Sequence, residues 1–267
     1  ENKNNIGISI LDIADLNGYI RLHYSIYSKE NTTIKMILDY DSGNINYVDK
    51  KGEYIIHHTV YSKNITTVSR LLDFKPIINV QNKSGESALH IACNLQLYDI
   101  ANLLIKHHIN LNLQDNFDNT VLHYSVNVGD KNLVRLLLKN DIDVNKQDIY
   151  GNTAIHLSIV GDNFECYKLI LTHKTINLNL LNIHGKIPLH IILDNKMYGY
   201  IDTQILENSN LNIQDNDGNT CLMLLCTNNL IEKYKNILEK KKLDIFIKNK
   251  KNKRAIDLVK DKSLLYD

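Results

Sequence analysis

Six histidines recur along this chain at intervals of 33 or 34 residues: His23, His57, His90, His123, His156 and His190. Imidazole binds metals and moves protons near neutral pH, so a regular column of rings could form a metal ladder or an acid–base site. Each ring occupies the same place in its own repeat, about one helix-pair layer or roughly 10 Å from the next. That spacing is too wide to share an ion. Since buried polar groups are normally hydrogen-bonded, we expect the rings to be structural.

The same short phrase surrounds each histidine. It opens with Asp or Asn, continues through two variable residues and usually Gly, and ends with Thr or Ser, an apolar residue and His; residues 148–156 are the cleanest copy. A fixed period of this length predicts a stacked array of small units, none of which can bury its apolar face alone. The opening residues are Asp15, Asp49, Asn82, Asp115, Asp148, Asn182, Asp215 and Asn249.

Two apolar stretches with helical periodicity follow each phrase. In the fourth copy they are residues 121–128 and 132–139, and Gly129 with Asp130 separates them. The pattern predicts a helix, a tight turn and a second helix in every unit. Residues 142–147 then return to the next phrase, and their Asp and Asn side chains suit a turn. The sequence therefore predicts an all-α repeat protein.

The phrases at 87–92 (Ser-Ala-Leu-His-Ile-Ala), 153–156 and 187–190 resemble the Thr-Pro-Leu-His-x-Ala core of the ankyrin repeat. The resemblance implies an ankyrin solenoid with short β-hairpin-like turns. It implies one array over 1–267, with repeats starting near 15, 49, 82, 115, 148, 182 and 215 and a partial terminal or capping repeat from 249. It also implies that each histidine ring binds the backbone or the Thr hydroxyl of the turn. Three positions depart from the pattern: Asp118 replaces the turn glycine, and Met223 and Asp257 replace the histidine.

No enzyme signature interrupts the array. The sequence contains no phosphate loop, no Gly-x-Ser-x-Gly elbow and no His-Glu-x-x-His motif. The four cysteines are spaced unlike a zinc site, and their repeat positions are typical of small buried residues, which predicts reduced thiols. We expect no catalytic residue, no cofactor and no metal. The cysteines are Cys93, Cys166, Cys221 and Cys226.

Net charge and hydropathy limit the partners and the cellular location that we expect for this chain. The formal net charge is +1, so no global field selects nucleic acid or an anionic membrane. No apolar run approaches the ~20 residues that cross a bilayer, and the N-terminus has no secretory pattern. We expect a monomeric, intracellular and cytoplasmic protein with no membrane insertion. The chain begins at Glu1 rather than Met, which indicates a piece excised or processed from a longer protein.

A basic run ends the chain and leaves three interpretations open. Its lysines can favour the end of a helix dipole and solvate the last repeat, because terminal repeats need a polar outer face. The segment 250–254 could also serve nuclear import or an acidic partner. Nucleic-acid binding fits least well, since Phe246 is the sole aromatic residue in the run. The cations are Lys240, Lys241, Lys242, Lys248, Lys250, Lys251, Lys253 and Arg254.

Partner-binding residues follow from the resemblance. In ankyrin arrays the turns and the outer ends of the first helices line a concave face that grips other proteins. Apolar and aromatic side chains occupy these positions where polar ones would serve the fold equally well, and aromatic residues carry much of the energy of protein interfaces. We expect Phe117 and Tyr150 to anchor a partner protein. The turn residues are Phe117, Ile149, Tyr150, Ile183 and His184, and the helix-end residues are Tyr61, Leu95 and Val128.

Composition indicates the kind of source. The chain has 36 asparagines with many isoleucines and lysines, which are encoded by A/T-rich codons. In this bias and in its strict spacing it resembles the ankyrin proteins of poxviruses, which capture host factors. The partner would then be a host regulatory or signalling factor, met in the host cytoplasm or nucleus. Two alternatives remain: a recognition segment of a larger enzyme or ubiquitin-ligase adaptor, and a scaffold for a membrane or cytoskeletal protein.

Overall fold

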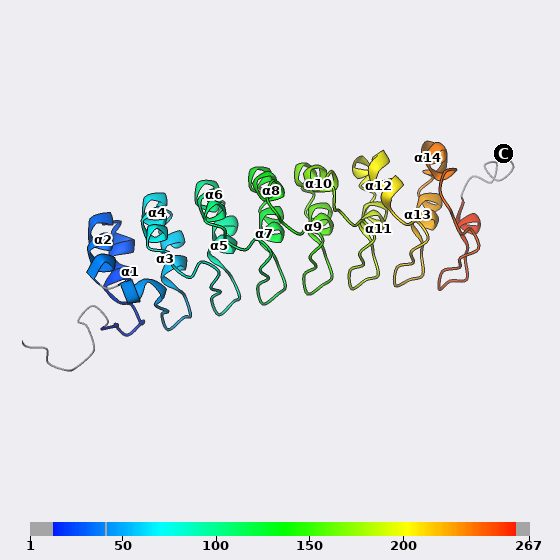
Figure 1. The fold of residues 1–267 in the computed structure, drawn as a ribbon. Coiled ribbons are helices and arrows are strands. Elements are labelled where there is room, and N and C mark those ends of the chain that lie inside the picture. Colours follow the sequence, from blue (N-terminus) through cyan, green and yellow to red (C-terminus); the bar gives the residue numbers. More distant parts are fainter. Residues whose placement is uncertain (1–12, 41, 260–267) are drawn as a thin grey trace, which may run out of the picture. The chain divides into compact units, whose positions relative to one another are not determined.

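The computed structural model describes residues 13–40 and 42–259, and the chain divides into two compact units. Unit 1 comprises Glu1–Val128 and Asn140–Ile142, and unit 2 comprises Gly129–Lys139 and Asp143–Asp267. The two ends of the expected array, 1–12 and 260–267, lie outside the described residues. Each unit consists of short helices joined by long turns (Figure 1).

In unit 1 the helices form two rows (Figure 1). First helices pack on one another in the order α1, α3, α5 and α7, and second helices in the order α2, α4 and α6. The elements are α1 (Arg21–Ser28), α2 (Asn31–Tyr40), the 3-10 helix η2 (Ser42–Asn46), α3 (Ile55–Tyr61), α4 (Ile65–Asp73), α5 (Ala88–Asn94), α6 (Tyr98–Lys106) and α7 (Val121–Asn127).

Unit 2 repeats this arrangement. Helix α9 packs on α11 and α11 on α13, while α10 packs on α8 and α12 on α14. The elements are α8 (Lys131–Leu138), α9 (Ala154–Val160), α10 (Phe164–Leu171), α11 (Pro188–Asp194), η3 (Tyr198–Tyr200), α12 (Thr203–Asn208), α13 (Cys221–Thr227), α14 (Ile231–Leu238) and η4 (Ala255–Leu258). The predicted all-α fold of helix–turn–helix units is confirmed. The hairpin-like turns contribute only three isolated β-bridges among the described residues.

The opening Asp or Asn of each phrase builds its turn. Asp148 is typical, because its Oδ1 accepts the backbone N–H groups of Tyr150 and Asn152, both at 2.8 Å. Gly151 then adopts a φ of +70°, and a Cβ there would lie 2.9 Å from the Cα of Asn182. Asp118 holds the matching left-handed position in the fourth copy, with a φ of +58°. A short polar side chain tolerates that conformation better than most, although glycine adopts it more easily.

Glutamine side chains link successive turns within each unit. The Nε2 of Gln147 donates to the carbonyl of Gly151 in its own turn at 2.6 Å and to that of Leu181 in the next repeat at 2.8 Å. Gln81 in unit 1 and Gln214 in unit 2 make the same pair of contacts. All of these acceptors are backbone carbonyls, so the link does not depend on the side chains of the neighbouring repeat.

The buried core residues recur at the same position of successive repeats. Leu71 and Leu104 in unit 1, and Leu137 and Ile170 in unit 2, recur 33 residues apart on the second helices and are fully buried. Burying one such side chain stabilises the fold by about 1.5–3 kcal/mol. The four cysteines are buried, and none of them forms a disulfide. The last copy shows one 3-10 turn, η4, where a first helix would stand, and the described residues end at 259.

Candidate protein-binding surface

The histidine column has a shared hydrogen-bonding geometry. In all six repeats Nδ1 accepts the backbone N–H of the residue three positions earlier, at 3.1–3.3 Å. Because an amide N–H can only donate, the proton of the neutral ring sits on Nε2. In four rings Nε2 faces a backbone carbonyl. That carbonyl belongs to the next repeat for three of them, as where His156 reaches Lys186 at 3.1 Å, and to Val80, just before the next repeat, for His57. Burial lowers the pKa of His90 and His190, which keeps both rings neutral near pH 7.

His23 differs from the other rings. Its Nε2 is buried and has no hydrogen-bond partner among the described residues. The ring stacks on Tyr19 with centroids 4.8 Å apart and meets His58 edge-on at 4.5 Å. Burial, and then the proximity of His58, lowers the pKa of His23 to about 4. Protonation of His23 therefore opposes the folded state.

The predicted binding residues of unit 2 come together on two adjacent turns. The backbone N–H of Ile183 donates to the carbonyl of Tyr150 at 2.9 Å, which places the turns side by side. Ile149 is 43% exposed, and Tyr150 and Ile183 are each 55% exposed. His184 next to them is also exposed. These four residues are called the isoleucine–tyrosine patch below.

The predicted binding residues of unit 1 are more dispersed. Phe117 is 59% exposed on a turn that is held by a hydrogen bond of 3.0 Å from the Asn116 N–H to the Ser84 carbonyl. Tyr61 is the exposed last residue of α3, whereas Leu95 and Val128 are half-buried caps of α5 and α7. Phe117 belongs to unit 1 and Tyr150 to unit 2.

A second group of side chains in unit 1 was not predicted as a binding site from the sequence, apart from its member Tyr61. It lies where the turns meet the first helices, and tyrosine hydroxyls there are hydrogen-bonded to carboxylates. Tyr24 Oη donates to Asp15 Oδ2 at 2.6 Å, and Tyr124 Oη donates to Asp115 Oδ2 at 2.8 Å and to Glu86 Oε1 at 3.1 Å. This tyrosine–carboxylate face comprises Asp15, Tyr24, Tyr27, Asp49, Glu53, His58, Tyr61, Glu86, Asp115 and Tyr124.

Two further contacts lie on this face, the first between neighbouring repeats and the second within one repeat. Tyr27 Oη lies 2.6 Å from His58 Nδ1, and His58 Nε2 lies 3.3 Å from Asp49 Oδ2. Burial lowers the pKa of His58, so the ring is neutral near pH 7. Burial raises the pKa of Tyr61, and the charges of Glu53 and Glu86 raise it further.

Comparison with known proteins agrees with this geometry. The model of the family described as ankyrin repeats (3 copies) matches residues 22–115, 106–182 and 122–203. The chain belongs to the ankyrin repeat family. An ankyrin repeat protein of Acanthamoeba polyphaga mimivirus is 37% identical over 86 residues, which are 32% of this chain and 11% of the viral protein. The crystal structure of the ankyrin repeat domain of Bcl-3, a member of the IkappaB protein family, superposes with a TM-score of 0.61 at 16% identity, over 92% of this chain and 96% of that one.

The family explains why the tyrosine–carboxylate face escaped the sequence analysis. Its acids at 53 and 86 follow the turn glycine directly, and its tyrosines at 24, 27, 61 and 124 lie on first helices. These repeat positions do not determine the ankyrin fold, so their identity carries information about ligands. The available signal was the coincidence of Tyr and Glu at such positions in successive repeats, which the search for apolar turn residues did not include.

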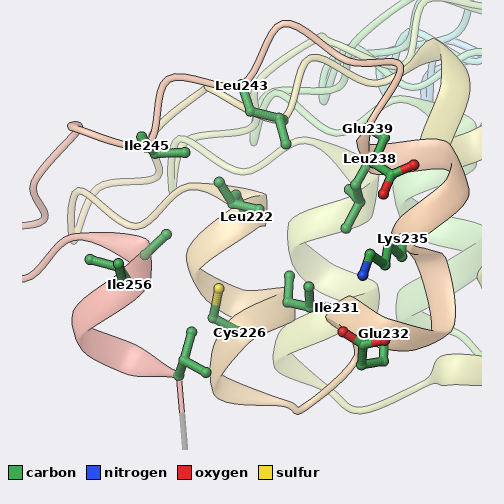
Figure 2. Close-up of a pocket in the computed structure, with 12 residues that line it drawn as sticks. Leu222, Cys226, Ile231, Glu232, Lys235, Leu238, Glu239, Leu243, Ile245 and Ile256 are labelled. Atoms are coloured by element: carbon green, nitrogen blue, oxygen red, sulfur yellow. The ribbon is translucent and has the colours of Figure 1, made fainter. Parts of the chain in front are cut away.

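The C-terminal end of unit 2 carries an apolar groove of about 360 Å³ between α13, α14 and η4 (Figure 2). Leu222, Ile231 and Leu238 line it, with Glu232 and Glu239 beside them. Part of the basic run is used within the fold. Lys241 Nζ donates to the carbonyls of Ser209, at 2.9 Å, and of Glu207, while Arg254 pairs with Asp257 at 3.2 Å.

Other kinds of site have little support in the described part of the chain. No helix there is both long and apolar enough to span a membrane. The same residues contain no group of three or more His, Cys, Asp or Glu side chains suited to a metal ion. Ankyrin repeats are generally protein–protein interaction modules, and proteins of this family and fold are typically not enzymes.

Proposed function

We propose that this chain binds a partner protein through the turns and first-helix ends of its repeats, with the isoleucine–tyrosine patch as the main anchor. The observation that carries the proposal is the exposure of Ile149, Tyr150 and Ile183 on two turns joined by a hydrogen bond. Their side chains make no contribution to the core, so the fold does not account for three apolar residues at this place. Contiguous apolar patches mark interaction sites more reliably than scattered residues do.

The patch has the composition of an interface centre. Tyr150 combines a large apolar ring with a hydroxyl and loses little conformational freedom on binding. Two isoleucines flank it, and His184 supplies a polar edge. In unit 1, Phe117 and the helix-end residues Tyr61, Leu95 and Val128 are proposed as further contacts with a protein partner.

The proposed partner is a host regulatory protein, met in the host cytoplasm or nucleus. Two findings support this setting. A relative with the same kind of repeats comes from a mimivirus, and four buried cysteines that form no disulfide suit a reducing compartment. The aligned segment spans 11% of that viral protein.

Affinity capture from a eukaryotic lysate, followed by mass spectrometry, tests the proposal. The wild-type chain is compared with the double variant Tyr150→Ala/Ile183→Ala, in which we expect the captured partner to fall at least tenfold. The matched control is Met36→Ala/Tyr40→Ala, which removes two exposed apolar side chains from the second helix α2. Circular dichroism verifies that all three proteins fold.

Loss of the partner with the patch variant but not with the control supports the proposal. If no protein is captured by the wild-type chain, or if capture is equal for all three proteins, the isoleucine–tyrosine patch is not the anchor.

A further inference from the structure

The tyrosine–carboxylate face of unit 1 carries more negative charge than its surroundings neutralise. Five carboxylates lie on it: Asp15, Asp49, Glu53, Glu86 and Asp115. None of them forms an ion pair with a described lysine or arginine, and the imidazoles that approach them belong to His57 and His58. Their hydrogen-bond donors are otherwise uncharged, such as the Asn82 amide, which reaches Glu53 at 3.0 Å and Glu86 at 3.2 Å.

Two of these carboxylates also have one oxygen that lacks a hydrogen-bond donor. Asp49 Oδ2 and Glu53 Oε2 are buried and accept no hydrogen bond of adequate geometry among the described residues. Glu53 Oε2 lies 3.1 Å from His57 Nδ1, which already accepts the Tyr54 N–H at 3.1 Å. In the neutral ring two acceptors therefore face each other. A buried acceptor without a donor is costly, so an incoming donor would relieve this contact.

Aromatic rings stand beside the acids. Tyr24, Tyr27 and Tyr61 are exposed, and the charges of Glu53 and Glu86 act on Tyr61. Burial raises the pKa of Tyr27, so its hydroxyl stays protonated where it lies 2.6 Å from His58 Nδ1. A cation over a tyrosine face is attracted by the ring, and carboxylates beside the ring add an ion pair.

The turns limit which cation fits. Lys50 and Lys83 are exposed at the rim, and their ammonium groups donate to the backbone carbonyls of Leu16 at 2.8 Å and of Lys50 at 2.7 Å rather than to the acids. Lys51 adds a third positive charge there. This rim repels a long basic run, so a single cation between neutral or acidic residues fits best. Arginine suits the face better than lysine, because its planar guanidinium stacks on rings and pairs with carboxylates through two hydrogen bonds.

We propose that the tyrosine–carboxylate face binds a partner segment presenting one arginine, which pairs with Glu53 and Glu86 and stacks on Tyr27 or Tyr61. The inference rests on the proposed function, that the chain is a protein-binding module, and it adds the chemistry of a second contact in unit 1.

A displayed library of random heptapeptides is the probe, panned on the full chain. We expect arginine to be enriched at least tenfold at one position, with no enrichment of consecutive basic residues. The double variant Glu53→Gln/Glu86→Gln should lose this enrichment. Glu232→Gln/Glu239→Gln removes the same charge from exposed positions on and beside α14 of unit 2 and should keep it.

The best peptide is then synthesised with arginine and with neutral citrulline. Citrulline should weaken binding at least tenfold on the wild-type chain and at most twofold on Glu53→Gln/Glu86→Gln. Selection of peptides without arginine, selection of basic runs, failure to select any peptide, or equal arginine enrichment on that variant would overturn the inference. If lysate capture still depends on Tyr150 and Ile183, the proposed function survives its failure.

Discussion

The two units share one architecture but present different chemistry on their turn sides. In the second and third copies, which belong to unit 1, the residue after the turn glycine is Glu53 or Glu86, and these acids meet tyrosines without a lysine or arginine partner. In unit 2 the equivalent positions hold Asn152, Lys186 and Asn219, and Lys186 pairs with Asp194 at 2.7 Å. Unit 1 therefore gathers carboxylates and tyrosines beside two of its turns, whereas two adjacent turns of unit 2 expose the isoleucine–tyrosine patch.

This difference separates what the fold requires from what it leaves free. The Asp or Asn that opens each turn and the buried leucines recur in both units, because turn geometry and core packing demand them. The residues after the glycine and at the first-helix ends vary, since they meet solvent or a ligand. Ligand chemistry in this chain is thus encoded at a few positions of each repeat.

The largest expected effect tests the shared core. Leu104→Ala in unit 1 and Leu137→Ala in unit 2 remove fully buried side chains at equivalent repeat positions. Each should lower the free energy of unfolding by about 2–5 kcal/mol, since a cavity replaces the packed leucine. Chemical denaturation, with hydrogen exchange to locate the loss, measures both variants. Losses that differ by more than about threefold would contradict the equivalence of the two cores.

The second-largest expected effect is a loss of stability at acidic pH that is greater in unit 1 than in unit 2. The pKa of His23 is lowered to about 4, and burial also lowers the pKa values of His58 and His90 in unit 1; in unit 2 the lowered value is that of His190. A lowered folded-state pKa means that the unfolded chain takes up the proton first as the pH falls. Stability is therefore complete above about pH 6.5 and declines toward pH 4.

We expect unit 1 to lose on the order of 2 kcal/mol between these pH values and unit 2 to lose less. Hydrogen exchange of α1 and α3, compared with α11 and α13, measures the difference at each pH. Equal protection of both pairs of helices at pH 4.5 would argue against a distinct role for His23.

The smallest expected effect has opposite signs in the two units. Asp194→Asn breaks the half-exposed pair with Lys186 and should destabilise the protein by less than about 1 kcal/mol. Glu53→Gln removes a charge that no described lysine or arginine neutralises, and it replaces the carboxylate that faces the acceptor His57 Nδ1 with a neutral amide. It should leave stability unchanged or raise it by up to about 1 kcal/mol. Urea denaturation of the two single variants decides the point, and a clear loss with Glu53→Gln would show that this carboxylate is needed by the fold.

Much of the architecture could be predicted because the repeat signal is local. The helix expected over 121–128 is α7 (Val121–Asn127), and the left-handed conformation expected at Asp118 is present. The replacements of histidine were harder to interpret. Asp257 Oδ2 accepts the Arg254 N–H at 2.9 Å and so takes the place of a ring Nδ1. The Met223 side chain offers no such acceptor, and its own N–H donates to Thr220 Oγ1 at 3.3 Å.

The tyrosine–carboxylate face was missed for a physical reason. Tyr27 and His58 are 31 residues apart, and Glu86 and Tyr124 are 38 apart, yet each pair is in hydrogen-bonding contact. Hydropathy patterns within one repeat do not show which side chains of neighbouring repeats converge. Exposure had the same limit, because Leu95 and Val128 are half-buried although they occupy helix-end positions.

The glutamine links have a consequence for how a gene that encodes such repeats can evolve. Gln81, Gln147 and Gln214 each donate to the backbone of the following repeat and not to its side chains, so any successor that has the right length and a matching apolar core is an acceptable neighbour. A gene built from such interchangeable 33-residue cassettes can lose or duplicate one by recombination and still encode a foldable chain. The order of binding surfaces along the array is then free to be reshuffled faster than single substitutions could rebuild it.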